Sequence, residues 1–101
     1  MTDREMLELA AKTMWYDDAD WDHERKCIST EKLPGFRCFW NPITDDGDAL
    51  RLAVKMNITV HPGFVYTPTG RLIDCRDYAN IIGATRLAIV RAAAEIGKEM
   101  P

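Results

Sequence analysis

The sequence predicts a single small α+β domain, residues 1–101, in which helices cover a mostly antiparallel sheet of three or four strands. The length of 101 residues suits one ordinary domain. Apolar residues recur at helical spacing near the start, the middle and the end of the chain. Short strand-like segments follow one another between the last two of these helices, which favours antiparallel pairing. The expected order of elements is therefore α-β-α-β-β-β-α.

The first helix is predicted over residues 2–14. Thr2 is followed three residues later by Glu5, which is the pattern of a capping box at a helix N-terminus. Residues 15–35 are predicted to form a long loop, because acidic and aromatic residues interrupt the helical period and Leu33-Pro34-Gly35 has turn chemistry. The apolar residues on one side of the helix are Met6, Leu7, Ala10 and Met14.

The middle of the chain is predicted to hold a strand, residues 36–40, followed by a helix. Pro42 ends the strand because it has no N–H to donate to a ladder. Asp45 is expected to cap the helix, which runs to about Met56. Its inward stripe is predicted to be Leu50, Ala53 and Val54, with Arg51 and Lys55 facing solvent.

The last third of the chain is predicted to form strands and a closing helix. A short strand is expected at 58–60, and a hairpin at 64–75 whose turn is Thr67-Pro68-Thr69-Gly70. The closing helix spans about 84–99, with a start at Ala84, or earlier at Asn80 or Asp77. Its broad apolar surface predicts close packing against a sheet.

The net charge of −3 hides an asymmetry between the two halves. Residues 1–50 carry 6 basic and 12 acidic side chains, a net of −6, whereas residues 51–101 carry 7 and 4, a net of +3. An acidic first half can face a basic partner. The three cysteines and the lack of a secretory pattern favour a reducing, cytosolic compartment, and no apolar run suggests a membrane span.

The sequence offers little for catalysis or metal binding. Asp18, Asp20 and Asp22 have the first three spacings of a calcium loop, but His23 and Ser29 stand where that loop needs Gly and Glu. His and Cys residues lack the paired spacing of zinc sites. We therefore expect no enzyme and no cofactor. The strand pattern predicts that Cys38 and Cys75 are buried, whereas Cys27 is expected to react with thiol reagents.

Two binding functions remain open. Aromatic residues among acids are typical of a protein interface, which favours a non-catalytic binding or modulator protein. The alternative is a nucleic-acid-associated accessory protein that uses the basic second half, with Arg71, Arg76 and Tyr66 among the candidate contacts. We also expect dimerisation. The candidate partner-binding residues are Trp15, Tyr16, Asp17, Asp18, Asp20, Trp21 and Asp22.

Two segments carry a resemblance to a known group of proteins. Residues 40–55 read Trp-Asn-Pro-Ile-Thr-Asp-Asp-Gly-Asp-Ala-Leu-Arg-Leu-Ala-Val-Lys, and residues 84–97 form an Ala-rich helical segment. Together they resemble small proteins of tailed bacteriophages and prophages, a group similar to phage α-β-α sandwich domains. The resemblance implies a phage origin and a setting in the host cytoplasm. The partner expected for a binding protein is then a host or phage protein. It implies no activity and no catalytic residue.

Overall fold

The computed structural model describes residues 1–16, 18–33 and 36–100 and confirms the α+β class. The predicted elements occur in the predicted order, and two further strands lie between the first helix and the first predicted strand. In chain order the elements are α1 (Asp3–Thr13), β1 (Asp20–Asp22), β2 (Cys27–Leu33), β3 (Phe36–Trp40), α2 (Asp46–Lys55), β4 (Thr59–His61), β5 (Phe64–Tyr66), β6 (Leu72–Asp74) and α3 (Ile81–Lys98).

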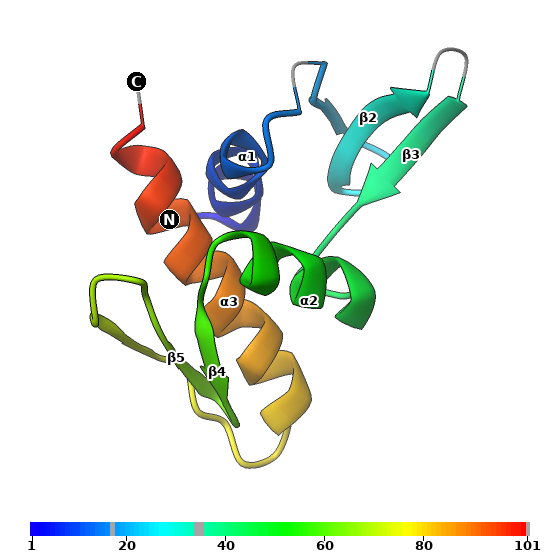
Figure 1. Cartoon of the computed structure of the whole chain (residues 1–101). Helices are drawn as coiled ribbons and strands as arrows, with labels where there is room; N and C mark the ends of the chain where they lie inside the picture. The colour runs from blue at the N-terminus through cyan, green and yellow to red at the C-terminus, as the bar shows by residue number, and fades with distance from the viewer. Residues whose placement is uncertain (17, 34–35, 101) are drawn as a thin grey trace.

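The six strands form two antiparallel sheets of three strands each, where a single sheet was expected. The N-terminal sheet has the order β1-β2-β3, and the C-terminal sheet has the order β4-β5-β6. In Figure 1 the β2–β3 hairpin reaches away from the helices, whereas β4 and β5 lie beside α3. The two sheets are therefore placed at different ends of the helical layer.

The prediction of a loop over residues 15–35 is wrong, because β1 and β2 lie within it. A tight turn at Lys26 joins the two strands, and this residue has a left-handed φ of 54°. The carboxylate of Asp22 accepts hydrogen bonds from the N–H groups of Glu24 and Arg25, at 3.0 and 2.8 Å. No glycine or proline marks this turn, so its chemistry is hard to recognise in the sequence. The Pro34-Gly35 part of the predicted turn lies outside the described residues.

The first helix begins as predicted. Thr2 is its N-cap, and Thr2 and Glu5 exchange the hydrogen bonds of a capping box. The helix packs closely against α3. Gly97 makes this approach possible, because a Cβ atom there would collide with the backbone carbonyl of Leu9.

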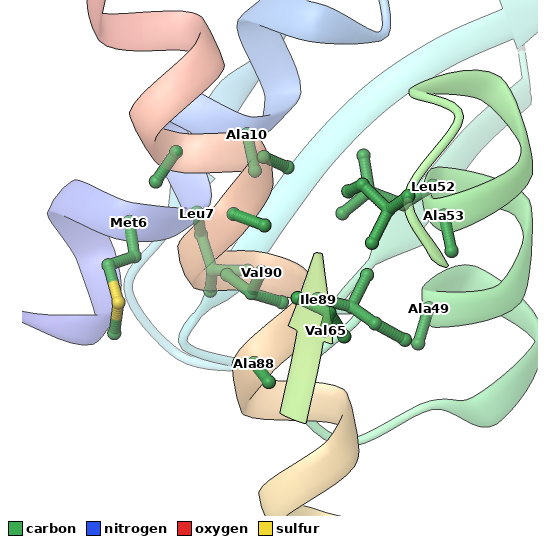
Figure 2. Packing of buried hydrophobic residues seen from close by; sticks show 14 of the residues in the cluster. Met6, Leu7, Ala10, Ala49, Leu52, Ala53, Val65, Ala88, Ile89 and Val90 are labelled. Atoms are coloured by element: carbon green, nitrogen blue, oxygen red, sulfur yellow. The ribbon is translucent and has the colours of Figure 1, made fainter. Parts of the chain in front are cut away.

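One apolar core joins the three helices to both sheets. Figure 2 shows Leu7 of α1, Leu52 of α2, and Val65 of β5 with Ile89 and Val90 of α3, among its members. The N-terminal sheet adds Ile28 and Trp40, and the side chain of Trp40 is almost fully buried. Its indole Nε1 has no hydrogen-bond partner among the described residues.

The inward stripe of α2 is predicted correctly at Ala53, and Arg51 and Lys55 face solvent as expected, but the prediction is wrong at Leu50 and Val54. Leu50 and Val54 are 63% and 72% exposed, whereas Ala49, Leu52 and Ala53 are buried. Asp48 explains the difference, because its carboxylate is also directed inward and accepts the N–H of Asn41 at 3.0 Å. Asp45 caps the helix as predicted, by accepting the N–H of Asp48 at 2.8 Å.

The C-terminal elements follow the predictions closely. The hairpin of β5 and β6 has the predicted turn, with Thr67 N–H donating to the carbonyl of Arg71 at 2.9 Å. The helix α3 begins before Ala84. Its N-cap is Asn80, which is one of the two earlier starts predicted from the sequence. Small residues dominate the buried surface of α3, so the helix approaches α1, α2 and the C-terminal sheet together.

The prediction for the cysteines is reversed. Cys27 is buried, and burial raises the pKa of its thiol. Cys38 and Cys75 are only partly buried. The reason is that Cys27 begins β2 beside the core residue Ile28, whereas Cys75 lies just beyond the end of β6, where Arg91 reaches its sulfur at 3.4 Å.

Candidate functional site

Trp15 presents the largest aromatic surface of the acidic-aromatic segment, which we define as residues 15–22. It follows the end of α1 with a left-handed φ of 58°, and the residue is 69% exposed. The backbone N–H of Trp15 donates to the carbonyl of Lys12 at 3.3 Å. A bulky residue rarely adopts this backbone conformation, so the fold holds Trp15 in place at a cost.

The other two aromatic residues of the segment pack against the protein. Tyr16 meets Trp40 edge to face, with 5.7 Å between ring centroids. Burial raises the pKa of the Tyr16 phenol, and the carboxylate of Asp48 adds to this effect. Trp21 is half-buried and lies under the guanidinium of Arg4, 5.4 Å from the ring centroid. Both residues therefore anchor the segment to the body.

Two of the predicted carboxylates stabilise the N-terminal sheet. Asp18 accepts hydrogen bonds from the Thr30 hydroxyl at 2.6 Å, from the Glu31 N–H at 2.7 Å, and from Arg37 at 3.2 Å. The first two bonds hold the pKa of the Asp18 carboxyl below its ordinary value. In the β1–β2 turn, the hydrogen bond from the Arg25 N–H likewise lowers the pKa of the Asp22 carboxyl.

Asp20 differs from these two carboxylates. It is exposed, and one of its oxygens accepts the N–H of Trp21 at 2.9 Å. Asp20 also lines a small cavity of about 160 Å³ between α1 and β1, together with Glu8 and Trp21. Arg4 lies at the same cavity and forms an ion pair with Glu8 at 2.9 Å. Asp17, the remaining predicted residue, lies outside the described residues.

An apolar patch on α2, β4 and α3 is not among the sites predicted from the sequence. We define it as Leu50, Val54, Val60 and Ile82, all of which are exposed. A groove of about 240 Å³ beside it is lined by three of these residues and by Ala49 and Ile89. The sequence contains the signal, because α2 has two overlapping apolar stripes and only one of them can face the core.

The outward face of the C-terminal sheet carries a cluster of rings. His61 stacks on Phe64 with 4.7 Å between centroids, and Tyr66 meets both rings edge to face. The guanidinium of Arg76 lies 5.1 Å from the centre of the Phe64 ring. Rings with a neighbouring cation are the groups on which nucleic-acid bases stack.

Three arginines of the second half form ion pairs with carboxylates. Arg71 pairs with Glu95 at 3.1 Å, Arg76 with Asp74 at 2.7 Å, and Arg86 with Asp46 at 2.6 Å. Each of these cations is therefore partly neutralised by a carboxylate of the same chain, which weakens the attraction of phosphate groups.

Among residues 1–16, 18–33 and 36–100, no group of three His, Cys, Asp or Glu side chains is arranged to hold a metal ion. No helix in the described part of the chain is long and apolar enough to cross a membrane. No family model, curated protein or solved structure matches the chain.

Proposed function

We propose that this protein acts by binding a basic protein of the host or of the phage, without catalysing a reaction. The observation that carries the proposal is the exposed indole of Trp15, held by a left-handed backbone at the end of α1. Tryptophan is enriched among the residues that dominate the energy of protein interfaces. A partner that covers this indole removes a large apolar surface from water.

Charge supports a basic partner. Asp20 lines the cavity between α1 and β1 and lies five residues after Trp15 in the chain. Glu8 lines the same cavity, where it also pairs with Arg4 at 2.9 Å. Residues 1–50 carry a net charge of −6, so the field around this half attracts positive groups. Lysine or arginine side chains of a partner are the groups that suit these carboxylates, and such complementarity raises the rate and specificity of association.

The phage origin and the host cytoplasm are part of the same proposal and rest on the resemblance of residues 40–55 and 84–97. A protein that modulates a host component needs a binding surface and no cofactor. The anchored residues Tyr16 and Trp21 then serve as the support that fixes Trp15 and Asp20, which lowers the entropy lost on binding.

A pull-down from bacterial lysate tests this proposal, with the tagged wild type compared with two variants after nuclease treatment. Trp15→Ala removes the proposed anchor, and Asp20→Asn removes one carboxylate at the cavity. Tyr78→Ala is the matched control, because Tyr78 is 86% exposed on the other half of the chain. Mass spectrometry identifies the captured proteins.

We expect a basic protein that survives nuclease treatment, is lost with Trp15→Ala, is reduced with Asp20→Asn and is kept with Tyr78→Ala. Capture that is equal in all variants would contradict the proposal.

The alternative, a nucleic-acid-associated protein, is favoured by the ring cluster of His61, Phe64 and Tyr66. In that case the recovered material disappears with nuclease, and binding weakens steeply with salt. Tyr66→Ala would then abolish capture, whereas Trp15→Ala would not. These results would replace the proposal by the alternative.

A further inference from the structure

A cavity of about 450 Å³ lies where the end of α2, the β5–β6 turn and the end of α3 meet. Its volume falls in the range of sites that bind small molecules, roughly 300–1,000 Å³. Its lining contains none of residues 15–22, so it shares no residue with the segment that carries the proposed function. Both apolar and charged side chains line it, and each kind restricts what the cavity can bind.

Hydrogen bonds within the chain fix the walls of this cavity. In the β5–β6 turn the Thr67 N–H donates to the carbonyl of Arg71 at 2.9 Å, and the Arg71 N–H donates to the Thr67 hydroxyl at 3.0 Å. The Arg71 guanidinium pairs with Glu95 of α3 at 3.1 Å and so joins the turn to the helix. Asn57 follows α2 with a left-handed φ of 55°. A cavity whose walls are already in place loses little entropy when a ligand enters.

The apolar part of the lining is rich in methionine. Met56, Ile96 and Met100 are half-buried and line the cavity from the two helix ends, and Pro68 lines it from the turn. Thioether side chains are flexible and make favourable contacts with aromatic rings. This part of the cavity therefore suits an apolar side chain, and an aromatic ring in particular.

Two charged groups at the cavity have no partner of opposite charge in the part of the chain that the structure describes. They are the ammonium group of Lys55 and the carboxylate of Glu99. The other two charged side chains of the lining, Arg71 and Glu95, neutralise each other. Glu99 is the C-cap of α3, where the helix dipole is already negative, so its carboxylate and the helix end together favour a positive group. Lys55 offers a cation to a negative group.

We propose that this cavity binds a small zwitterion with an apolar side chain, of the class of the apolar α-amino acids. The ammonium group of the ligand meets Glu99, and its carboxylate meets Lys55. The side chain of the ligand lies on Met56, Ile96 and Met100. A cation alone would leave Lys55 unpaired, and an anion alone would leave Glu99 unpaired. The lining therefore selects a molecule that carries both charges.

A titration followed by heteronuclear NMR tests the proposal with three probes that share one aromatic ring. Phenylalanine carries both charges, phenethylamine lacks the carboxylate, and hydrocinnamate lacks the ammonium group. A titration to about 10 mM detects complexes with millimolar dissociation constants. The test variants are Lys55→Met and Glu99→Gln. Their controls are Lys98→Met and Glu24→Gln, which remove the same charges at exposed residues outside the lining. Thermal unfolding checks that all variants fold.

We expect phenylalanine to shift the amide signals of residues at the cavity, such as Thr69 and Ile96. Each analogue should bind roughly fivefold more weakly, which is the effect of losing one partly exposed ion pair. Lys55→Met and Glu99→Gln should each weaken the binding of phenylalanine by a similar factor, and the controls should bind like the wild type. The absence of shifts at the cavity would overturn the proposal. So would an analogue that binds as tightly as phenylalanine, or test variants that bind like the controls.

Discussion

The two sheets have the same number of strands but are attached to the body in different ways. In the C-terminal sheet the buried residues are Val65 and Ile73, on strands that pack against α3. Apolar contacts therefore hold this sheet on the body of the protein. The N-terminal sheet inserts Ile28 and Trp40 into the core, and polar contacts of Asp18 close its outer part. The comparison teaches that apolar contact sets the position of a sheet, whereas carboxylate hydrogen bonds fix the segment that carries Trp15.

The attachment of the N-terminal sheet is tested most strongly at Trp40. Trp40→Ala should lower the free energy of unfolding by about 3–5 kcal/mol, because the side chain is buried in the core. Phe39→Ala is the matched control, since the neighbouring residue of β3 is 46% exposed, and it should cost less than about 1 kcal/mol. Urea unfolding followed by circular dichroism measures both. Similar losses would mean that Trp40 does not anchor this sheet.

The helix α2 connects the two sheets, so its buried face tests whether they share one core. Leu52→Ala should cost about 2–5 kcal/mol, because Leu52 is fully buried. Leu50→Ala should change the free energy of unfolding by less than about 0.5 kcal/mol, because Leu50 is exposed. One cooperative transition in both variants is expected. A larger loss of stability for Leu50→Ala than for Leu52→Ala would mean that Leu50 faces the core, as the sequence predicts.

The smallest expected effect is the loss of the Asp18 hydrogen bonds at acid pH. The folded protein holds the pKa of Asp18 below its ordinary value, so its stabilisation is complete above that value. This stabilisation is lost as the pH falls below about 4, which is the ordinary pKa of an aspartate, and then through the lower pKa of Asp18 in the folded protein. The protection of the Glu31 amide against hydrogen exchange, relative to the intrinsic exchange rate at each pH, should therefore fall more in acid than the protection of the Val65 amide.

Asp18→Asn keeps the shape of the side chain and removes the charge. We expect this variant to show lower protection of the Glu31 amide already at neutral pH and little further loss of protection in acid. An unchanged acid response would show that Asp18 does not control the N-terminal sheet.

The elements predicted from the sequence are those with local chemical signals. Thr67-Pro68-Thr69-Gly70 marks its turn, Thr2 and Glu5 mark the start of α1, and Asn80 caps α3. The strands β1 and β2 were missed because their turn depends on a lysine with positive φ and on the side chain of Asp22. These contacts are local, but the residue types alone do not show that they form, because no glycine or proline marks the turn.

The candidate site was only partly visible in the sequence for the same reason. The pattern of acids and aromatics drew attention to residues 15–22, but it does not separate the exposed Trp15 from the half-buried Tyr16 and Trp21. The patch on α2 was hidden because either of two stripes could face inward. The inward-directed carboxylate of Asp48 decides between them, and its partner, the Asn41 N–H, is seven residues away.

The most direct test of the proposed function is the affinity of the captured partner, measured by calorimetry with the purified proteins. Trp15→Ala should weaken binding by roughly thirtyfold, the effect of losing about 2 kcal/mol at an interface hot spot. Tyr78→Ala should bind like the wild type. Equal affinities for the wild type and Trp15→Ala would contradict the claim that Trp15 anchors a partner protein.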